Sequence, residues 1–232
     1  MNKTDTAEKL AVFLAKRDGI DKLVKTFQYV SKLVQWHLDT SMPAVTDRAK
    51  KWEVASGISR KAFRTGRFLN GFNTIRRTAP TQTPLFQALT ILSNGGEMVY
   101  FFFDHLLWLS RIGVFNPNLA ARMSYVSAFG EAVGYVFFII TDVIAIRRCL
   151  VSRRMLLAGD NDDHLDREEL EEKVRVIGGD VVMRWMSVAA NLADLVIALA
   201  EVKPNPVCNH QLTLSISGLV SAWAGWYRNW PS

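Results

Sequence analysis

The chain has 232 residues, a formal net charge of +6 and a hydrophobic fraction of 49 %. This length fits one or two domains. The hydrophobic fraction alone does not distinguish a soluble protein from a membrane protein. Two cysteines, Cys149 and Cys208, are too few for a disulfide framework or a zinc site. The first residues, MNKTDTAEKL, lack the apolar core of a secretory signal, so nothing indicates a secreted protein.

The first predicted element is a helix over residues 6–38, in which apolar residues recur every three or four positions. Asp18-Gly19 is expected to interrupt it, because Gly costs about 1 kcal/mol in a helix interior. Met42-Pro43 is expected to end it. A second helix is predicted to start at Thr46 or Asp47 and to run to Arg77.

Residues 58–77 of this second helix are the most informative part of the sequence, since they hold six basic residues and no acidic one. On a helical wheel, Arg60, Arg64 and Arg67 lie on one side. Apolar residues gather on the other, although Lys61 intrudes there and Phe63 leaves it. The members of the apolar side are Ile58, Ala62, Phe68, Leu69, Phe72 and Ile75.

Such a helix suits a membrane interface, with its cations over anionic lipid. Three alternatives stay open for this segment taken alone: a helix packed on its own domain, a nucleic-acid-binding helix and a calmodulin-binding helix.

The segment 78–84 is predicted to be a loop with two prolines, and it is the clearest boundary in the sequence. Beyond it lie four apolar stretches, each about long enough to cross ~30 Å of hydrocarbon. The fourth has no formally charged residue. The stretches are Leu85–Leu109, Ser124–Ile146, Val181–Val202 and Pro204–Tyr227.

Charge is distributed unevenly along the chain, because residues 1–84 carry sixteen Lys or Arg and only seven Asp or Glu. This predicts an all-α membrane protein whose basic region, residues 1–84, stays on the cytosolic side. Residues 85–146 are predicted to form membrane helices and 147–180 a soluble loop with a charged helix. Residues 181–232 are predicted to form further membrane helices and a short tail.

The first three apolar stretches each carry a narrow polar stripe. A charge that faces lipid costs several kcal/mol, so these stripes must turn inward or lie at the interface. Arg111 and Arg184 are candidate cationic partners for the buried acids. Pairing between helices, a polar solute pathway and a proton relay all remain open. The stripe members include Glu97, Asp104, Glu131, Asp142, Ser187, Asn191, Asp194 and Glu201.

Small residues in two stretches permit close helix packing and self-association. The helix-packing candidates are Gly130, Gly134, Gly218 and Ala222. Aromatic residues near Arg228 are typical of the belt where a membrane helix meets water. They are Trp223, Trp226, Tyr227 and Trp230.

No catalytic constellation is present in the sequence. It has no phosphate-binding glycine loop, no nucleophile elbow and no paired histidines at metal spacing. We therefore predict a protein that is not an enzyme and has no cofactor and no metal site.

Four segments resemble, in the same order, the peroxin-11 family of peroxisomal membrane proteins, and most closely its plant branch. They are KRDGIDKLVKTFQY (16–29), KKWEVASGISRKAFRTGRFLNGFN (50–73), GEMVYFFFDHLLWLSRIG (96–113) and SGLVSAWAGWYRNWPS (217–232). The resemblance covers nearly the whole chain and is weakest at Val151–Lys173.

The resemblance implies a multi-pass protein of the peroxisomal membrane that elongates and divides the organelle, with both termini in the cytosol. It implies that a basic amphipathic helix inserts into the cytosolic leaflet. By this resemblance, Arg60, Lys61, Arg64 and Arg67 would contact lipid head groups. The residues that would enter the acyl chains are Phe63, Phe68, Leu69, Phe72 and Ile75.

The partners implied are anionic phospholipid, further copies and relatives of this chain, a fission adaptor and a dynamin-related GTPase, with no nucleic acid. Two other functions stay open: a channel for small metabolites lined by the polar stripes, and a scaffold that recruits fission proteins through residues 160–172.

Overall fold

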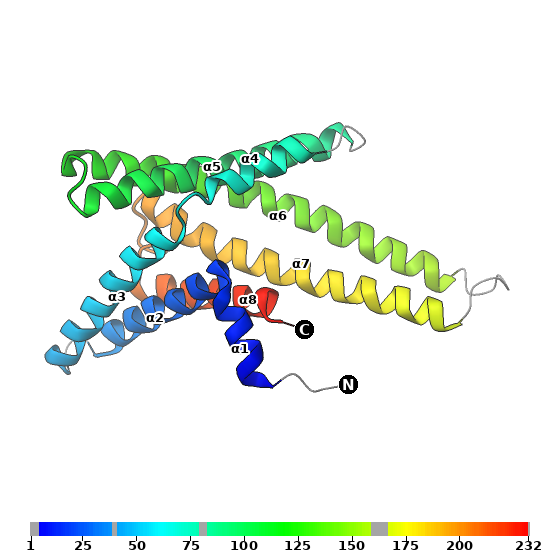
Figure 1. The fold of residues 1–232 in the computed structure, drawn as a ribbon, viewed down its shortest axis with the longest axis horizontal. Helices are drawn as coiled ribbons and strands as arrows, with labels where there is room; N and C mark the ends of the chain where they lie inside the picture. Colours follow the sequence, from blue (N-terminus) through cyan, green and yellow to red (C-terminus); the bar gives the residue numbers. More distant parts are fainter. Residues whose placement is uncertain (1–4, 39–40, 79–82, 159–166, 232) are drawn as a thin grey trace.

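The computed structural model describes residues 5–38, 41–78, 83–158 and 167–231, and within these ranges it contains helices and turns but no strand. The predicted all-α class is therefore confirmed. Figure 1 shows long helices lying side by side, with the far ends of α6 and α7 projecting from the body.

The first predicted helix consists of two helices, α1 (Thr6–Ala15) and α2 (Arg17–Leu38). The break lies at Lys16, two residues before the expected one. Gly19 stands in the first turn of α2, where a Cβ atom would lie 1.9 Å from the Phe13 carbonyl oxygen. The glycine is therefore required by the close approach of α1 rather than by the break itself.

The prediction of one helix from residue 46 or 47 to Arg77 is wrong. The chain forms α3 (Pro43–Phe63), a turn over residues 64–67 and α4 (Phe68–Arg77). Gly66 in this turn has a φ of 74°, a conformation that favours glycine. The turn lets α4 leave the direction of α3 and lie along α5. The predicted loop at 78–84 falls mainly on residues outside the described ranges.

The apolar half of the chain forms four long helices and a 3₁₀ turn. They are α5 (Pro84–Arg111), η1 (Pro117–Leu119), α6 (Ala120–Ala158), α7 (Arg167–Val202) and α8 (Gln211–Asn229). Of the described helices, those at Pro117–Ala158 and Glu168–Val202 are long and apolar enough to cross a membrane. The sequence had singled out the fourth stretch instead, but its first residues form turns before α8 begins at Gln211.

The segment 147–180 is helical over most of its described length, because α6 continues to Ala158 and α7 begins at Arg167. With 39 residues, α6 is about 58 Å long, roughly twice the thickness of the hydrocarbon layer. One end of α6 must therefore extend beyond any bilayer that it crosses. Most of the acidic segment 160–172, the candidate recruitment site, lies outside the described residues.

Helices α5 and α6 approach each other through three glycines. A Cβ atom on Gly96 would lie 2.5 Å from the Gly134 nitrogen and 2.7 Å from the Gly130 carbonyl oxygen. Gly218 of α8 faces the ring of Tyr29, and Ala222 is fully buried. The helix-packing candidates thus make close contacts within one chain. Their part in self-association stays a prediction.

We expect Gly96→Ala to destabilise the protein by about 1–3 kcal/mol, because the atoms that a methyl group would meet belong to the backbone of α6. Gly95→Ala is the matched control, since a Cβ atom there has no neighbour within 4 Å. It should be neutral or stabilising, by up to about 1 kcal/mol. Thermal unfolding in detergent, followed by circular dichroism, measures both. Equal effects of the two variants would contradict the packing.

The aromatic residues at the end of α8 divide between packing and exposure. Trp226 stacks on Phe13 of α1, with ring centroids 4.4 Å apart. Trp223 and Tyr227 are more than half exposed. The stacking of Phe13 on Trp226 therefore packs α1 against α8.

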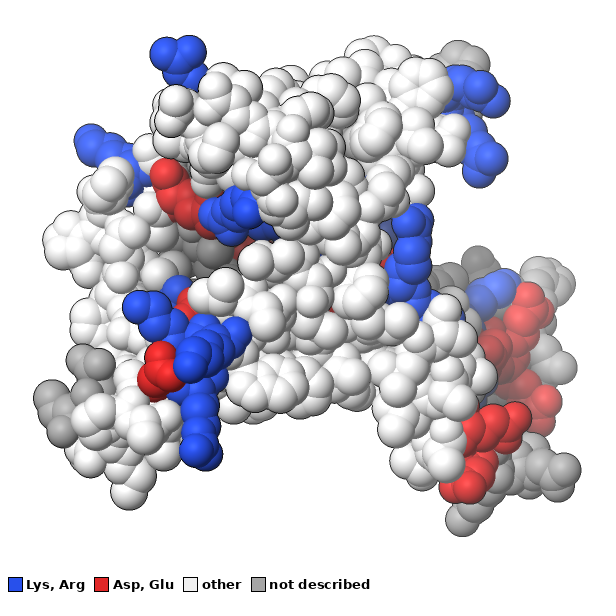
Figure 2. Space-filling view, turned by 60° about the vertical axis from the view of Figure 1, so that its left-hand side comes forward, with Lys and Arg blue, Asp and Glu red and all other residues white. Residues whose placement is uncertain are grey.

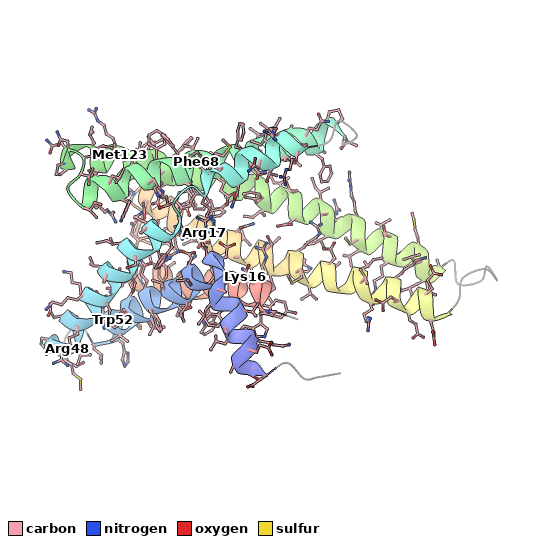
Figure 3. The ribbon with its side chains drawn as sticks, viewed as in Figure 1. Lys16, Arg17, Arg48, Trp52, Phe68 and Met123 are labelled. Atoms are coloured by element: carbon pink, nitrogen blue, oxygen red, sulfur yellow. The ribbon has the colours of Figure 1, made fainter. Side chains whose placement is uncertain are left out.

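Much of the outer surface is apolar. On the α2–α3 hairpin, Phe27 and Trp52 are 46 % and 61 % exposed and meet edge to face. Figure 3 places Trp52 and Arg48 on the outer part of α3. In Figure 2 most of the visible face is uncharged, and the charged side chains gather in a few clusters. Much of the outer surface is therefore uncharged and rich in apolar side chains, while several charged groups lie inside.

Candidate functional site

The four basic residues that were expected to face lipid head groups turn into the protein instead. Arg60 is 7 % exposed, and the side chains of Lys61, Arg64 and Arg67 are 16 %, 11 % and 22 % exposed. Each lies within ion-pair distance of an aspartate. Binding of these four residues to lipid stays a prediction. In this structure each of them is paired with an aspartate of the same chain.

Asp21 of α2 is the centre of this charge cluster. It is 1 % exposed, and its Oδ1 atom accepts from the Nε atoms of Arg60 at 3.1 Å and Arg64 at 3.0 Å. Burial alone would raise the pKa of the Asp21 carboxyl, but the guanidinium groups of Arg64 and Arg60 more than offset this and hold the pKa well below its usual range. Asp21 therefore stays ionised and joins α2 to the end of α3.

Two further contacts connect the end of α3 to α5. The Lys61 ammonium donates to the Asp104 carboxylate, and Arg64 donates to the Tyr100 hydroxyl. Asp104 is itself 2 % exposed. Because a buried charge must be paired, these contacts hold α3 against the bundle through polar groups.

The turn between α3 and α4 is fixed to the start of α2. The Arg67 guanidinium lies 2.7 Å from Asp18, and Arg17 donates to the Thr65 carbonyl oxygen at 2.8 Å. Figure 3 shows Arg17 at this junction, with Phe68 on the adjoining part of α4. Arg67 also lies over the ring of Phe101, 5.0 Å from its centroid.

The apolar candidates divide between the protein and its surface. Phe68 packs edge to face on Phe102 of α5, and Ile75 is half-buried. Phe63, Leu69 and Phe72 are 40 %, 50 % and 50 % exposed. The segment thus presents apolar side chains outward while its first four cations point inward, which is the reverse of a helix on a soluble domain.

A polar cavity of about 470 Å³ lies among α2, α3, α5, α6, α7 and α8. The stripe predicted on α7 lines it, through Ser187, Asn191, Asp194 and Glu201. From Met183 to Glu201 the lining extends over nineteen residues, or about 27 Å along the helix axis. The lining on α7 therefore extends over nearly the thickness of a hydrocarbon layer.

The two walls of the cavity carry opposite charge. The wall formed by α2, α3 and the turn after α3 is mainly cationic, with Asp18 as an exception. The facing wall of α5–α7 is mainly acidic, with Arg111 as an exception. The cations of the first wall are Lys22, Lys25, Arg60, Lys61, Arg64 and Arg67, the acids of the facing wall are Glu97, Asp104, Glu131, Asp194 and Glu201, and α8 adds Arg228.

Lys25 bridges these walls in the interior. Its ammonium lies 2.5 Å from Asp194 and 2.6 Å from the Ser221 hydroxyl, and that hydroxyl donates to Asp194 at 2.6 Å. Glu131 accepts from Tyr135 at 2.8 Å, and the Tyr135 hydroxyl is 3.5 Å from Asp194. A continuous polar network therefore crosses from α2 to α6.

Two acids of the predicted stripes pair with cations of the basic N-terminal region, whereas Glu131, Asp142 and Glu201 contact groups on α6 and α7. Asp104 pairs with Lys61 and Asp194 with Lys25. Arg184 was expected to pair with one of Glu97, Asp104, Glu131, Asp194 and Glu201, and it pairs instead with Asp142 at 3.3 Å. Sequence reasoning missed Asp21 and Lys25, although each lies on the inner face of the α2 pattern.

The sequence pattern of one protein family, described as peroxisomal biogenesis factor 11 (PEX11), matches residues 7–230. The chain is 62 % identical to peroxisomal membrane protein 11B of Arabidopsis thaliana over 228 residues, which is 98 % of this chain and 99 % of that protein. It is 61 % identical to peroxisomal membrane protein 11-4 of Oryza sativa subsp. japonica over 232 residues, the full length of both. A homologue from Dictyostelium discoideum is 28 % identical over 248 residues, covering 99 % of this chain and 96 % of the other. No solved structure matches the chain.

Proposed function

Because this chain belongs to the peroxisomal biogenesis factor 11 family, whose relatives are peroxisomal membrane proteins, we propose that it elongates the peroxisomal membrane by inserting an apolar helical edge into the cytosolic leaflet. In this proposal it promotes peroxisome proliferation and acts at high local density through self-association. A fission adaptor and a dynamin-related GTPase then divide the elongated membrane. It is a membrane protein with no catalytic role.

The observation that carries this proposal is the position of α4. One side of α4 packs on α5, where a Cβ atom on Gly71 would lie 2.6 Å from the Met98 side chain. Leu69 and Phe72 are half exposed beside this contact. Arg76 and Arg77 are exposed at the end of the helix. The helix thus offers apolar side chains with cations next to them, at the edge of the bundle (Figure 1).

A shallow insertion of this kind bends a bilayer because it enlarges one leaflet relative to the other. The apolar residues enter only the boundary between head groups and acyl chains, while the arginines stay with anionic head groups. One helix adds little area, so curvature requires many copies close together. Self-association is therefore part of the proposal rather than an addition to it.

We expect Leu69→Glu with Phe72→Glu to abolish elongation, because burying the exposed half of these two side chains supplies about 1.5–3 kcal/mol of insertion free energy, and two carboxylates oppose insertion. Both are half exposed in the protein, so the fold should persist. The purified chain should form tubules from anionic vesicles, seen by electron microscopy, and should elongate peroxisomes in cells. The double variant should do neither.

Asn70→Glu with Asn73→Glu is the matched control, since these exposed polar residues on the same helix receive the same two charges. It should retain much of the activity, although the added charge reduces attraction to anionic lipid. Tubules formed equally well by both double variants would contradict the role of α4.

A second candidate function, the passage of small metabolites, is favoured by the polar cavity. The lining runs along α7 for about the thickness of a hydrocarbon layer, and the outer surface of the bundle is apolar. Polar side chains inside an apolar helical bundle are the arrangement that lines aqueous pathways in membranes.

A further inference from the structure

The basic residues that are predicted to bind lipid head groups are not available to lipid in this structure. Arg60, Lys61, Arg64 and Arg67 are mostly buried, and each lies beside an aspartate. Their apolar neighbours on the same segment are already half exposed. A membrane surface would therefore meet the apolar side chains first, while the cations stay bound to the protein.

We propose that Asp18, Asp21 and Asp104 form an intramolecular clasp, which occupies these four cations until anionic lipid head groups replace the aspartates. The proposal rests on the proposed function, because it concerns the lipid-binding surface of the same segment. It adds an interaction surface, the inner face of residues 60–67, and an autoinhibitory contact that covers it.

The contacts of the clasp identify the part that moves. Helix α2 is held to α8 by the Tyr29 ring against Gly218 and, through α1, by Phe13 on Trp226. Lys25 of α2 also binds Ser221 of α8 and Asp194 of α7. The end of α3 is held to α2 and α5 by the charged contacts of Asp21 and Asp104. Lipid head groups would compete for the four cations of residues 60–67 and leave in place the apolar packing and the buried Lys25 contacts of α2, so the end of α3 moves while α2 stays.

The turn after α3 can accommodate this movement. Gly66 is at a φ of 74°, and a Cβ atom there would meet no atom within 4 Å. The backbone at Gly66 therefore has open space beside it, and the turn can change direction there while α4 keeps its contact with α5. Glycine also has access to other backbone conformations at little cost.

The aspartates left behind would not be stranded in an apolar core. Asp18 and Asp104 line the polar cavity of about 470 Å³, and Asp21 lines a smaller adjoining pocket. Water in these spaces can hydrate the carboxylates after the cations leave. Because four cations gain lipid contacts together, opening should depend steeply on the anionic lipid content.

The test measures the position of α3 in the full chain. Spin labels are placed at Ser59 on α3 and Leu192 on α7, both exposed, in a chain that carries Cys149→Ser and Cys208→Ser. The protein is reconstituted in phosphatidylcholine vesicles with increasing phosphatidylserine. We expect the label distance to lengthen as phosphatidylserine rises. Asp104→Asn should raise the open-to-closed ratio in pure phosphatidylcholine about tenfold or more.

The controls separate charge competition from a general loss of structure. Asp47→Asn makes the same change on α3, in an exposed pair with Lys51, and should leave the distance unchanged. Lys61→Asp should open the clasp, and Lys61→Asp with Asp104→Lys should close it again in phosphatidylcholine. This charge exchange tests the Lys61–Asp104 contact even if the Asp104→Asn variant fails to fold. Soluble glycerol phosphate added to phosphatidylcholine vesicles should not open it, whereas opening there would show recognition of free phosphate instead of a lipid surface.

The clasp would be overturned if the distance between the two labels did not change with phosphatidylserine content in the wild-type chain and did not change in any clasp variant. The proposed function has its own outcome, because tubule formation and its loss in the Leu69→Glu, Phe72→Glu variant are measured separately. Tubules from a chain whose label distance never changes would reject the clasp and keep the proposed function.

Discussion

Replacing Asp21 by asparagine should lower the free energy of unfolding by about 3–5 kcal/mol, one of the largest effects expected of any single substitution in this chain. Asparagine has nearly the same shape, so the loss comes from charge rather than from packing. Asp21 is 1 % exposed and pairs with both Arg60 and Arg64. The variant would leave two largely buried guanidinium groups without their shared carboxylate.

The effect of this substitution should depend on pH. The pKa of Asp21 is lowered in the folded protein, so its contribution to stability is fully present above the unfolded-state pKa of about 4. That contribution is lost as the pH falls below this value toward the folded-state pKa. The difference between wild type and Asp21→Asn should therefore be constant near neutral pH and should shrink in acid.

Titration with a denaturing detergent, followed by circular dichroism, measures this difference at each pH. Asp47→Asn is the control, because the Asp47–Lys51 pair on α3 is exposed and should contribute at most about 1 kcal/mol. If Asp21→Asn matched Asp47→Asn at neutral pH, the charge cluster around Asp21 would not hold α2 and α3 together.

Helical periodicity predicted the elements of this fold better than it predicted their ends. The class and the apolar helices α5, α6 and α7 follow from residue spacing. The break at residues 64–67 does not, because the periodic pattern continues through it. That break depends on where Asp21 and Asp104 lie, and these residues are distant in sequence from the arginines that they bind.

The orientation of the basic segment shows a limit of the helical wheel. The wheel separated the arginines from most of the apolar residues, but it cannot tell which side faces the protein. In a soluble domain the apolar side would be buried, and here the cations are buried while Leu69 and Phe72 are half exposed. The intrusion of Lys61 into the apolar side also has a cause, since Lys61 reaches Asp104 on α5.

The polar stripes were predicted well, because a period of three and four residues marks one side of a helix. Ser187, Asn191 and Asp194 of α7 all line the cavity. Their partners could not be predicted, since pairing is decided by how the α2–α3 hairpin packs against the bundle. A charge in an apolar stretch indicates that a partner exists, and only the tertiary structure identifies it.

Asn191→Phe should remove most of the conductance of the purified protein in planar bilayers, if the cavity carries small solutes. Asn191 lies near the middle of the α7 stripe, where its amide donates to Ser187. A phenyl ring there would fill part of a cavity of about 470 Å³ and would replace polar lining with an apolar barrier. Leu192→Phe is the matched control. Leu192 follows Asn191 in the sequence but is 49 % exposed on the outside of the bundle, so this substitution should leave the conductance unchanged.

The selectivity of the conductance for anions or cations is a second test of whether ions pass through the cavity. Neutralising Glu97 removes a carboxylate from the acidic wall only, so Glu97→Gln should favour anions over cations. Conductance that survives Asn191→Phe with unchanged selectivity would show that ions do not pass through this cavity. Absence of any conductance by the wild-type chain would remove solute passage altogether. The polar interior would then act through its ion pairs alone, holding the basic segment against α2 and α5.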